Sequence, residues 1–164
     1  MAKQLTALQL AAGDAYLTSA VQHSKRMLNR RALMSGAAGA IPLPGLDWVV
    51  DAALLNNLIP KINAEFGLAE HQIAALDPSR RERIQQAVAL VGTMLIGKFV
   101  TKDLLLRAAK AVGVRLTAQQ AVKFLPLAGQ ALSALISYSA IRYLGEQHLR
   151  DCVRVLLKEQ QLSK

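Results

Sequence analysis

The chain of 164 residues has little cysteine, few aromatic side chains and a low share of charge. Its single cysteine, Cys152, excludes an intramolecular disulfide and fits a reducing compartment. Aromatic residues make up 4% and charged residues 19%, so the 52% of hydrophobic residues are mostly Ala, Leu, Val and Ile. Such small aliphatic side chains allow helices to approach one another closely. Because aromatic residues are few and no recognition motif is present, specific nucleic-acid binding is not expected.

The chain also lacks any stretch that alternates between apolar and polar residues with the period of a strand. Apolar residues recur instead at helical spacing, and turn signals separate the helical stretches. The sequence therefore predicts an all-α fold, formed as one compact domain over residues 1–164. We expect about six to eight helices, some of them paired as kinked hydrophobic hairpins.

Cap and turn signals place the helices of the first half. Apolar residues predict a first helix over about residues 4–22. Asp47 is a candidate N-cap of a helix that ends at Gly67. Pro60 lies inside that helix and predicts a kink near Asn56, because a proline removes one backbone donor and crowds the preceding turn.

The second half carries similar signals. Asp77 followed by Pro78 is a strong helix start, and an uncharged stretch extends over 84–97. Thr101 and Thr117 are candidate caps of two further helices. The last helix is expected to begin between residues 127 and 131 and to end near residue 161.

Two proline-containing segments interrupt the helical pattern. Pro42 and Pro44 stand two residues apart, so both cannot lie inside one regular helix, and Gly45 follows them. Pro126 and Gly129 mark a second break. We expect both segments to be turns between apolar helices.

The length of the uncharged runs bears on whether the chain crosses a membrane. The longest one, residues 124–141, meets the lower limit for a spanning helix but contains Pro126 and several polar residues. The stretch 84–97 is too short to span alone. Buried core helices are the favoured interpretation of both, and inserted hydrophobic hairpins or a spanning protein are the alternatives.

The charge that is present is basic, with 20 basic and 11 acidic residues and a net charge of +9. It is concentrated before two apolar stretches, as Lys25, Arg26, Arg30 and Arg31 and as Arg80, Arg81 and Arg83. Basic residues beside apolar helices attract anionic lipid, at about 1 kcal/mol for each charge near the surface. Trp48, the single tryptophan, is a candidate interfacial anchor. A solvated basic face and a Trp48 packed in the core are the alternatives.

Three patterns resemble catalytic or metal sites and fall short. Residues 92–98 read G-x-x-x-x-G-K, but Phe99 replaces the hydroxyl residue of a phosphate-binding loop, and the run is helical rather than a loop after a strand. His148 and Cys152 have a metal-capable spacing without further ligands. Asp47 and Asp51 at a helix start suit capping better than acid–base catalysis. We therefore expect no enzyme activity, cofactor or metal.

Two stretches, residues 36–68 and 121–153, resemble the domain-of-unknown-function family 697. The first has a small apolar run, a Pro-x-Pro turn, an acidic residue and a final Phe-Gly; the second has a Pro-x-x-Gly turn and a small-residue helix with a late Tyr and Gly. The matching residues are Pro42, Pro44, Asp47, Phe66 and Gly67, then Pro126, Gly129, Tyr143 and Gly145. The resemblance covers about residues 33–158 and implies association with a membrane or with an Era-like GTPase, although this chain has no GTPase domain.

These features together predict a non-enzymatic helical module that docks on the cytosolic face of a bacterial membrane, or on a membrane-linked or GTPase partner. The alternative is a soluble protein-binding regulator or an immunity-type inhibitor of a partner protein. The apolar run near the start is broken by Gln4, Gln9 and Asp14, which does not suit a signal peptide. We therefore expect a cytoplasmic protein, peripheral at the inner membrane if it binds lipid, and leave a homo-oligomer open.

Overall fold

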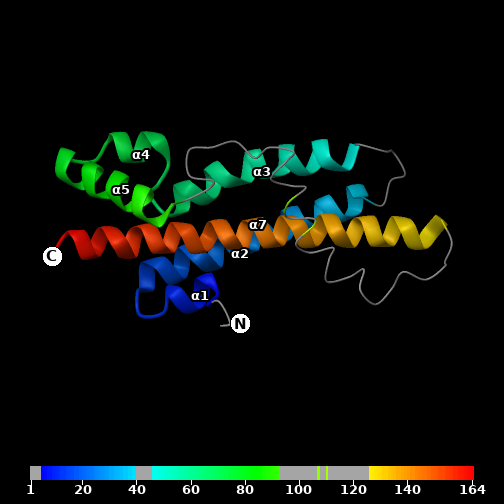
Figure 1. The fold of residues 1–164 in the computed structure, drawn as a ribbon, viewed down its shortest axis with the longest axis horizontal. Helices are drawn as coiled ribbons and strands as arrows, with labels where there is room; N and C mark the ends of the chain where they lie inside the picture. Colours follow the sequence, from blue (N-terminus) through cyan, green and yellow to red (C-terminus); the bar gives the residue numbers. More distant parts are fainter. Residues whose placement is uncertain (1–4, 40–45, 93–106, 108–109, 111–125) are drawn as a thin grey trace. The chain divides into compact units, whose positions relative to one another are not determined.

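The computed structural model describes residues 5–39, 46–92, 107, 110 and 126–164. All regular structure within these residues is helical, which confirms the all-α prediction. The helices are α1 (Ala7–Leu10), α2 (Ala15–Gly39), α3 (Leu46–Glu65), α4 (Glu70–Ala74), α5 (Pro78–Val91) and α7 (Pro126–Leu162), labelled in Figure 1. Pro42, Pro44, Gly45, Thr101, Thr117 and the incomplete phosphate-loop pattern beyond Gly92 lie outside the described residues.

The chain divides into two compact units, each built from separate stretches of sequence. Unit 1 comprises Met1–Arg26, Ile59–Lys98 and Glu146–Lys164, and unit 2 comprises Met27–Leu58 and Phe99–Gly145. The long helices α2, α3 and α7 each contribute one part to either unit. The expectation of a single domain over residues 1–164 stays a prediction.

Unit 1 has an aliphatic core with one aromatic side chain. Its buried residues include some from the first half of α2, from α3 and the residue just after it, from α5 and from the end of α7, namely Leu17, Val21, Ile62, Phe66, Ile84, Leu149 and Val153. In unit 2, Leu28, Ala32, Leu55, Leu58, Ala140, Ile141 and Leu144 are buried. Both cores thus consist mainly of the small aliphatic residues that dominate the composition.

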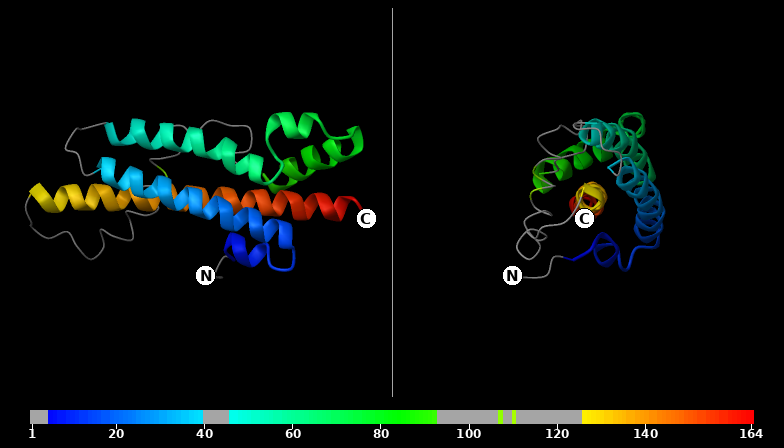
Figure 2. Two further views of the ribbon diagram at one scale, coloured as in Figure 1. Left: turned by 180° about the vertical axis from the view of Figure 1, so that it is seen from behind. Right: turned by 90° about the vertical axis from the view of Figure 1, so that its right-hand side faces the viewer.

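The first expected helix, over residues 4–22, is divided in two. Thr6 caps α1 in a reciprocal capping box with Gln9. Gly13 then takes a left-handed conformation with φ of 103°, and the Asp14 carboxylate accepts the N–H of Leu17 to start α2. Figures 1 and 2 show α1 folded back beside the first turns of α2.

The helix α3 begins one residue before Asp47, so the expected N-cap lies inside the helix. The helix also continues through Pro60 to Glu65. Gly67, the predicted closing residue, follows two positions after the helix with φ of 68°, and the N–H of Leu68 donates to the carbonyl of Asn63 at 2.8 Å. This pattern is a Schellman motif, in which a left-handed glycine allows the last carbonyls to find donors.

The start of α5 follows the sequence signal, because Asp77 accepts the N–H of Arg80 at 3.0 Å and Pro78 is the first helical residue. Its end does not. The helix stops at Val91, where Gly92 with φ of 66° closes it, instead of continuing to residue 97. The uncharged stretch over residues 84–97 contains no charged or proline residue that would predict the end of the helix, which depends on a left-handed glycine.

The last helix, α7, is described from Pro126 onward, and the residues just before Pro126 lie outside the described ones, so the break expected there stays a prediction. Gly129, expected to belong to the same break, lies instead within the first turn of the helix. A glycine lowers helix stability by about 1 kcal/mol relative to alanine but removes no hydrogen bond, so a 37-residue helix can include it. No helix in the described ranges is long and apolar enough to cross a membrane.

Candidate functional site

The outward face of α2 in unit 2 combines charge with exposed apolar side chains. Arg30, Leu33, Met34 and Ala37 are exposed and follow the spacing of one helical face. Leu33 is 65% and Met34 54% exposed, values that are high for large apolar residues. We call these four residues the α2 exposed face.

The opposite side of the same helical stretch is buried within unit 2. Leu28 is 2% exposed and Ala32 is fully buried. A side-chain carbon at residue 145 of α7 would overlap the Leu28 side chain as it is placed here, so Gly145 allows this side of α2 to pack closely against α7. This contact fixes which side of α2 faces outward.

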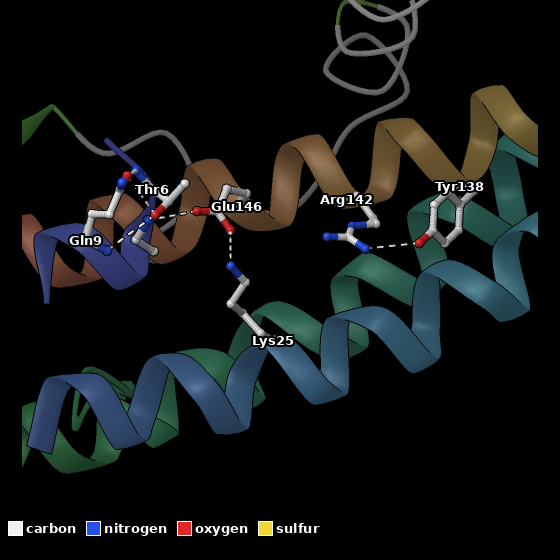
Figure 3. A network of polar contacts seen from close by, with 7 residues as sticks. Thr6, Gln9, Lys25, Tyr138, Arg142 and Glu146 are labelled. Carbon is white, nitrogen blue, oxygen red and sulfur yellow. Dashed lines mark hydrogen bonds and ion pairs between the residues drawn. The ribbon is translucent and has the colours of Figure 1, made fainter. Parts of the chain in front are cut away.

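The basic residues predicted just before this face have different surroundings. Lys25 belongs to unit 1 and pairs with Glu146 at 3.5 Å, and the other carboxylate oxygen of Glu146 accepts the N–H of Ala7 at 2.7 Å (Figure 3). Arg26 and Arg30 are exposed and Arg31 is partly exposed, and none of the three has an ion pair with another described residue. Within the part of the chain that the structure describes, the charges of Arg26, Arg30 and Arg31 therefore meet no carboxylate.

The second predicted basic cluster is engaged inside unit 1. Arg80 lies 3.7 Å and Arg83 3.3 Å from the Oε1 atom of Glu159, a side chain that is only 8% exposed. Arg81 donates to the carbonyls of Ala74 and Leu76, at the end of α4. These three arginines connect α4, α5 and α7, and we leave them out of the candidate surface.

The remaining predicted contact residue, Trp48, lies in α3 of unit 2, where the structure describes the helix but not that side chain. Asp47 and Asp51 lie in the same helix, and their side chains are likewise outside the description.

Two further basic residues of unit 2, Arg107 and Lys110, are exposed. Leu33 and Met34 were not predicted from the sequence, although their spacing of three and four residues from Arg30 is a signal that could have identified them.

Charge is distributed unequally between the units. Unit 2 has eight basic and three acidic residues among 79, a net charge of +5, and contains no glutamate. Unit 1 has twelve basic and eight acidic residues among 85, a net charge of +4. Unit 2 therefore carries fewer charges, with a larger basic excess among them.

His148 and Cys152 form a buried cluster with Asn63 in unit 1. The Nε2 atom of His148 lies 2.8 Å from the Oδ1 atom of Asn63, and the Cys152 sulfur lies 3.6 Å from the same nitrogen. Burial lowers the pKa of His148 to about 4 and raises that of the Cys152 thiol. At neutral pH the histidine is uncharged and the thiol stays protonated, so this pair is poorly suited to nucleophilic chemistry.

A search of the described ranges finds no group of three or more His, Cys, Asp or Glu side chains placed to hold a metal ion. Comparison with family models, curated proteins and solved structures finds no match for this chain. The resemblance to family 697 therefore stays a prediction.

Proposed function

We propose that this chain is a non-enzymatic helical module that docks on an anionic membrane surface through unit 2. The observation that carries the proposal is the α2 exposed face, where Arg30 is followed on one side of the helix by the exposed Leu33 and Met34. A helix that presents basic and apolar residues together suits the boundary between headgroups and acyl chains.

The charge of unit 2 supports an anionic surface as the partner. Its basic excess of eight to three lies in the unit that holds this face, and Arg107 and Lys110 add exposed positive charge. Electrostatic attraction to anionic lipid and burial of apolar side chains add together in interfacial binding. A protein partner with an acidic and apolar surface is the competing hypothesis, and the test below separates the two.

The test is flotation of the purified full chain with neutral vesicles and with vesicles rich in phosphatidylglycerol. We expect flotation only with the anionic vesicles. Arg30→Glu should weaken it by about 2 kcal/mol, because the change removes one positive charge and adds a negative one at about 1 kcal/mol each.

Lys61→Glu is the matched control, because Lys61 is an exposed basic residue of α3 in unit 1 without an ion pair to another described residue. We expect it to change flotation much less than Arg30→Glu. Absence of flotation by a folded sample, judged by circular dichroism, would reject the membrane proposal in favour of a protein partner.

A further inference from the structure

Unit 1 and unit 2 each expose a leucine to the same extent, which allows two surfaces to be compared. Leu33 on α2 and Leu90 on α5 are both 65% exposed. Exposure of an apolar side chain alone is common on protein surfaces and does not mark a binding site. The difference between the two positions lies in the charges around them.

The surroundings of Leu90 do not suit an anionic surface. The exposed residues one and two turns before it are Gln86 and the acidic Glu82. The arginine seven residues earlier, Arg83, is held by the buried Glu159 at 3.3 Å. An anionic headgroup beside Leu90 would meet a carboxylate and an arginine whose charge is already neutralised.

Leu33 has the opposite surroundings. Arg30 lies one turn before it on the same face, and Met34 and Ala37 continue that face with apolar side chains. Among the described residues no carboxylate pairs with Arg30 or Arg31. Cationic charge near the middle of α2 and apolar side chains toward its end match the two layers of a lipid interface, the phosphates and the upper acyl chains.

We infer that Leu33 and Met34 are the residues of unit 2 that insert into the lipid, with Arg30 on the headgroup phosphates. This inference depends on the proposed function and goes beyond it, because it assigns the insertion to one helical face. It also specifies that the corresponding leucine of unit 1, Leu90, stays outside the acyl region.

The test uses a polarity-sensitive dye attached to a single introduced cysteine. Cys152 is fully buried and its thiol pKa is raised, so it should not compete for the dye in the folded protein. We compare Met34→Cys with Leu90→Cys, with vesicles rich in phosphatidylglycerol, and add lipids brominated on the acyl chains as quenchers.

We expect a blue shift and quenching at position 34 and no change at position 90. In flotation, Leu33→Ser and Met34→Ser should each weaken binding roughly ten-fold, and Leu90→Ser should not, since each serine removes an apolar side chain that would be buried. All these residues are exposed, so the variants should keep the unfolding temperature of the wild type within a few degrees.

The outcomes separate the inference from the proposed function. If the labelled chain floats with anionic vesicles while the dye at position 34 stays in water, the insertion assignment is wrong and the docking proposal stands. Equal quenching at positions 34 and 90 also overturns the assignment. If no variant or wild-type chain floats, the docking proposal itself fails.

Discussion

At the scale of single residues, His148 is a titratable side chain that the fold removes from water. It is fully buried, its Nε2 atom has Asn63 as a partner, and its buried Nδ1 atom has no hydrogen-bond partner among the described residues. A charged imidazole there would lose its hydration without a compensating carboxylate, so burial lowers its pKa to about 4. The role of His148 is therefore to pack and to orient Asn63 while uncharged.

This burial predicts a loss of stability in mild acid. Above pH 6.5 the imidazole is uncharged in both folded and unfolded chains, so the full stability is present. As the pH falls from 6.5 toward 4, the unfolded chain takes up a proton that the folded chain does not, and the free energy of unfolding should drop by up to about 3 kcal/mol. Urea unfolding across this range measures the drop.

His148→Gln is the control for that experiment, because glutamine can still donate to Asn63 but does not titrate. Its stability should vary less between pH 6.5 and 4 than that of the wild type. Asp14, whose pKa is lowered mainly by the N–H of Leu17, adds a loss at lower pH in both proteins. Parallel curves for the two proteins between pH 6.5 and 4 would show that His148 is not the titrating group.

At the scale of elements, the buried carboxylate of Glu159 joins α5 to α7 within unit 1. It lies within 4 Å of both Arg80 and Arg83, whose side chains are 49% and 27% exposed. The carboxylate is mostly removed from water, whereas the two arginines keep part of their hydration. This contact accounts for two of the three arginines in the first turns of α5, Arg80 and Arg83.

Glu159→Gln should therefore destabilise the chain by about 1–3 kcal/mol, the usual cost of losing hydrogen bonds to a charged group. This loss of stability should be smaller than that caused by breaking a fully buried ion pair, because water can reach the two partly exposed arginines. Denaturant unfolding measures it. Asp151→Asn is the comparison, since the Asp151–Arg154 pair on one helix is more exposed and should contribute about 0.5 kcal/mol or less. An equal loss of stability in Glu159→Gln and Asp151→Asn would contradict the structural role given to Glu159.

At the scale of the whole molecule, the net charge of +9 and the exposed apolar residues predict two components of vesicle binding. The electrostatic component should weaken with salt, because the Debye length falls to about 3 Å at 1 M. The insertion of Leu33 and Met34 should leave residual flotation at high salt. In the same salt series, the Leu33→Ser variant should lose this residual flotation at a lower salt concentration than the wild type. Complete loss of flotation by the wild type at high salt would indicate electrostatic attraction alone.

Two helix boundaries could be predicted from local chemistry. The Asp77–Pro78 cap of α5 and the closure of α3 by Gly67 were predictable because each depends on a few neighbouring backbone groups. The division of the first helix at Gly13 and the end of α5 at Gly92 were not predicted. A glycine is compatible with both a helix interior and a left-handed turn, and only the packing of the flanking segments selects between them.

The sequence by itself determined the all-α class, the basic balance and the aliphatic composition, because periodicity, charge and residue type are properties of the chain. Only the tertiary structure decided which charges and apolar groups remain available. Two clusters of similar sequence differ because the arginines of one meet a buried glutamate, whereas the other continues onto an exposed helical face. Partners such as Glu159 lie 76 to 79 residues away from those arginines in sequence, so no local pattern could have revealed them.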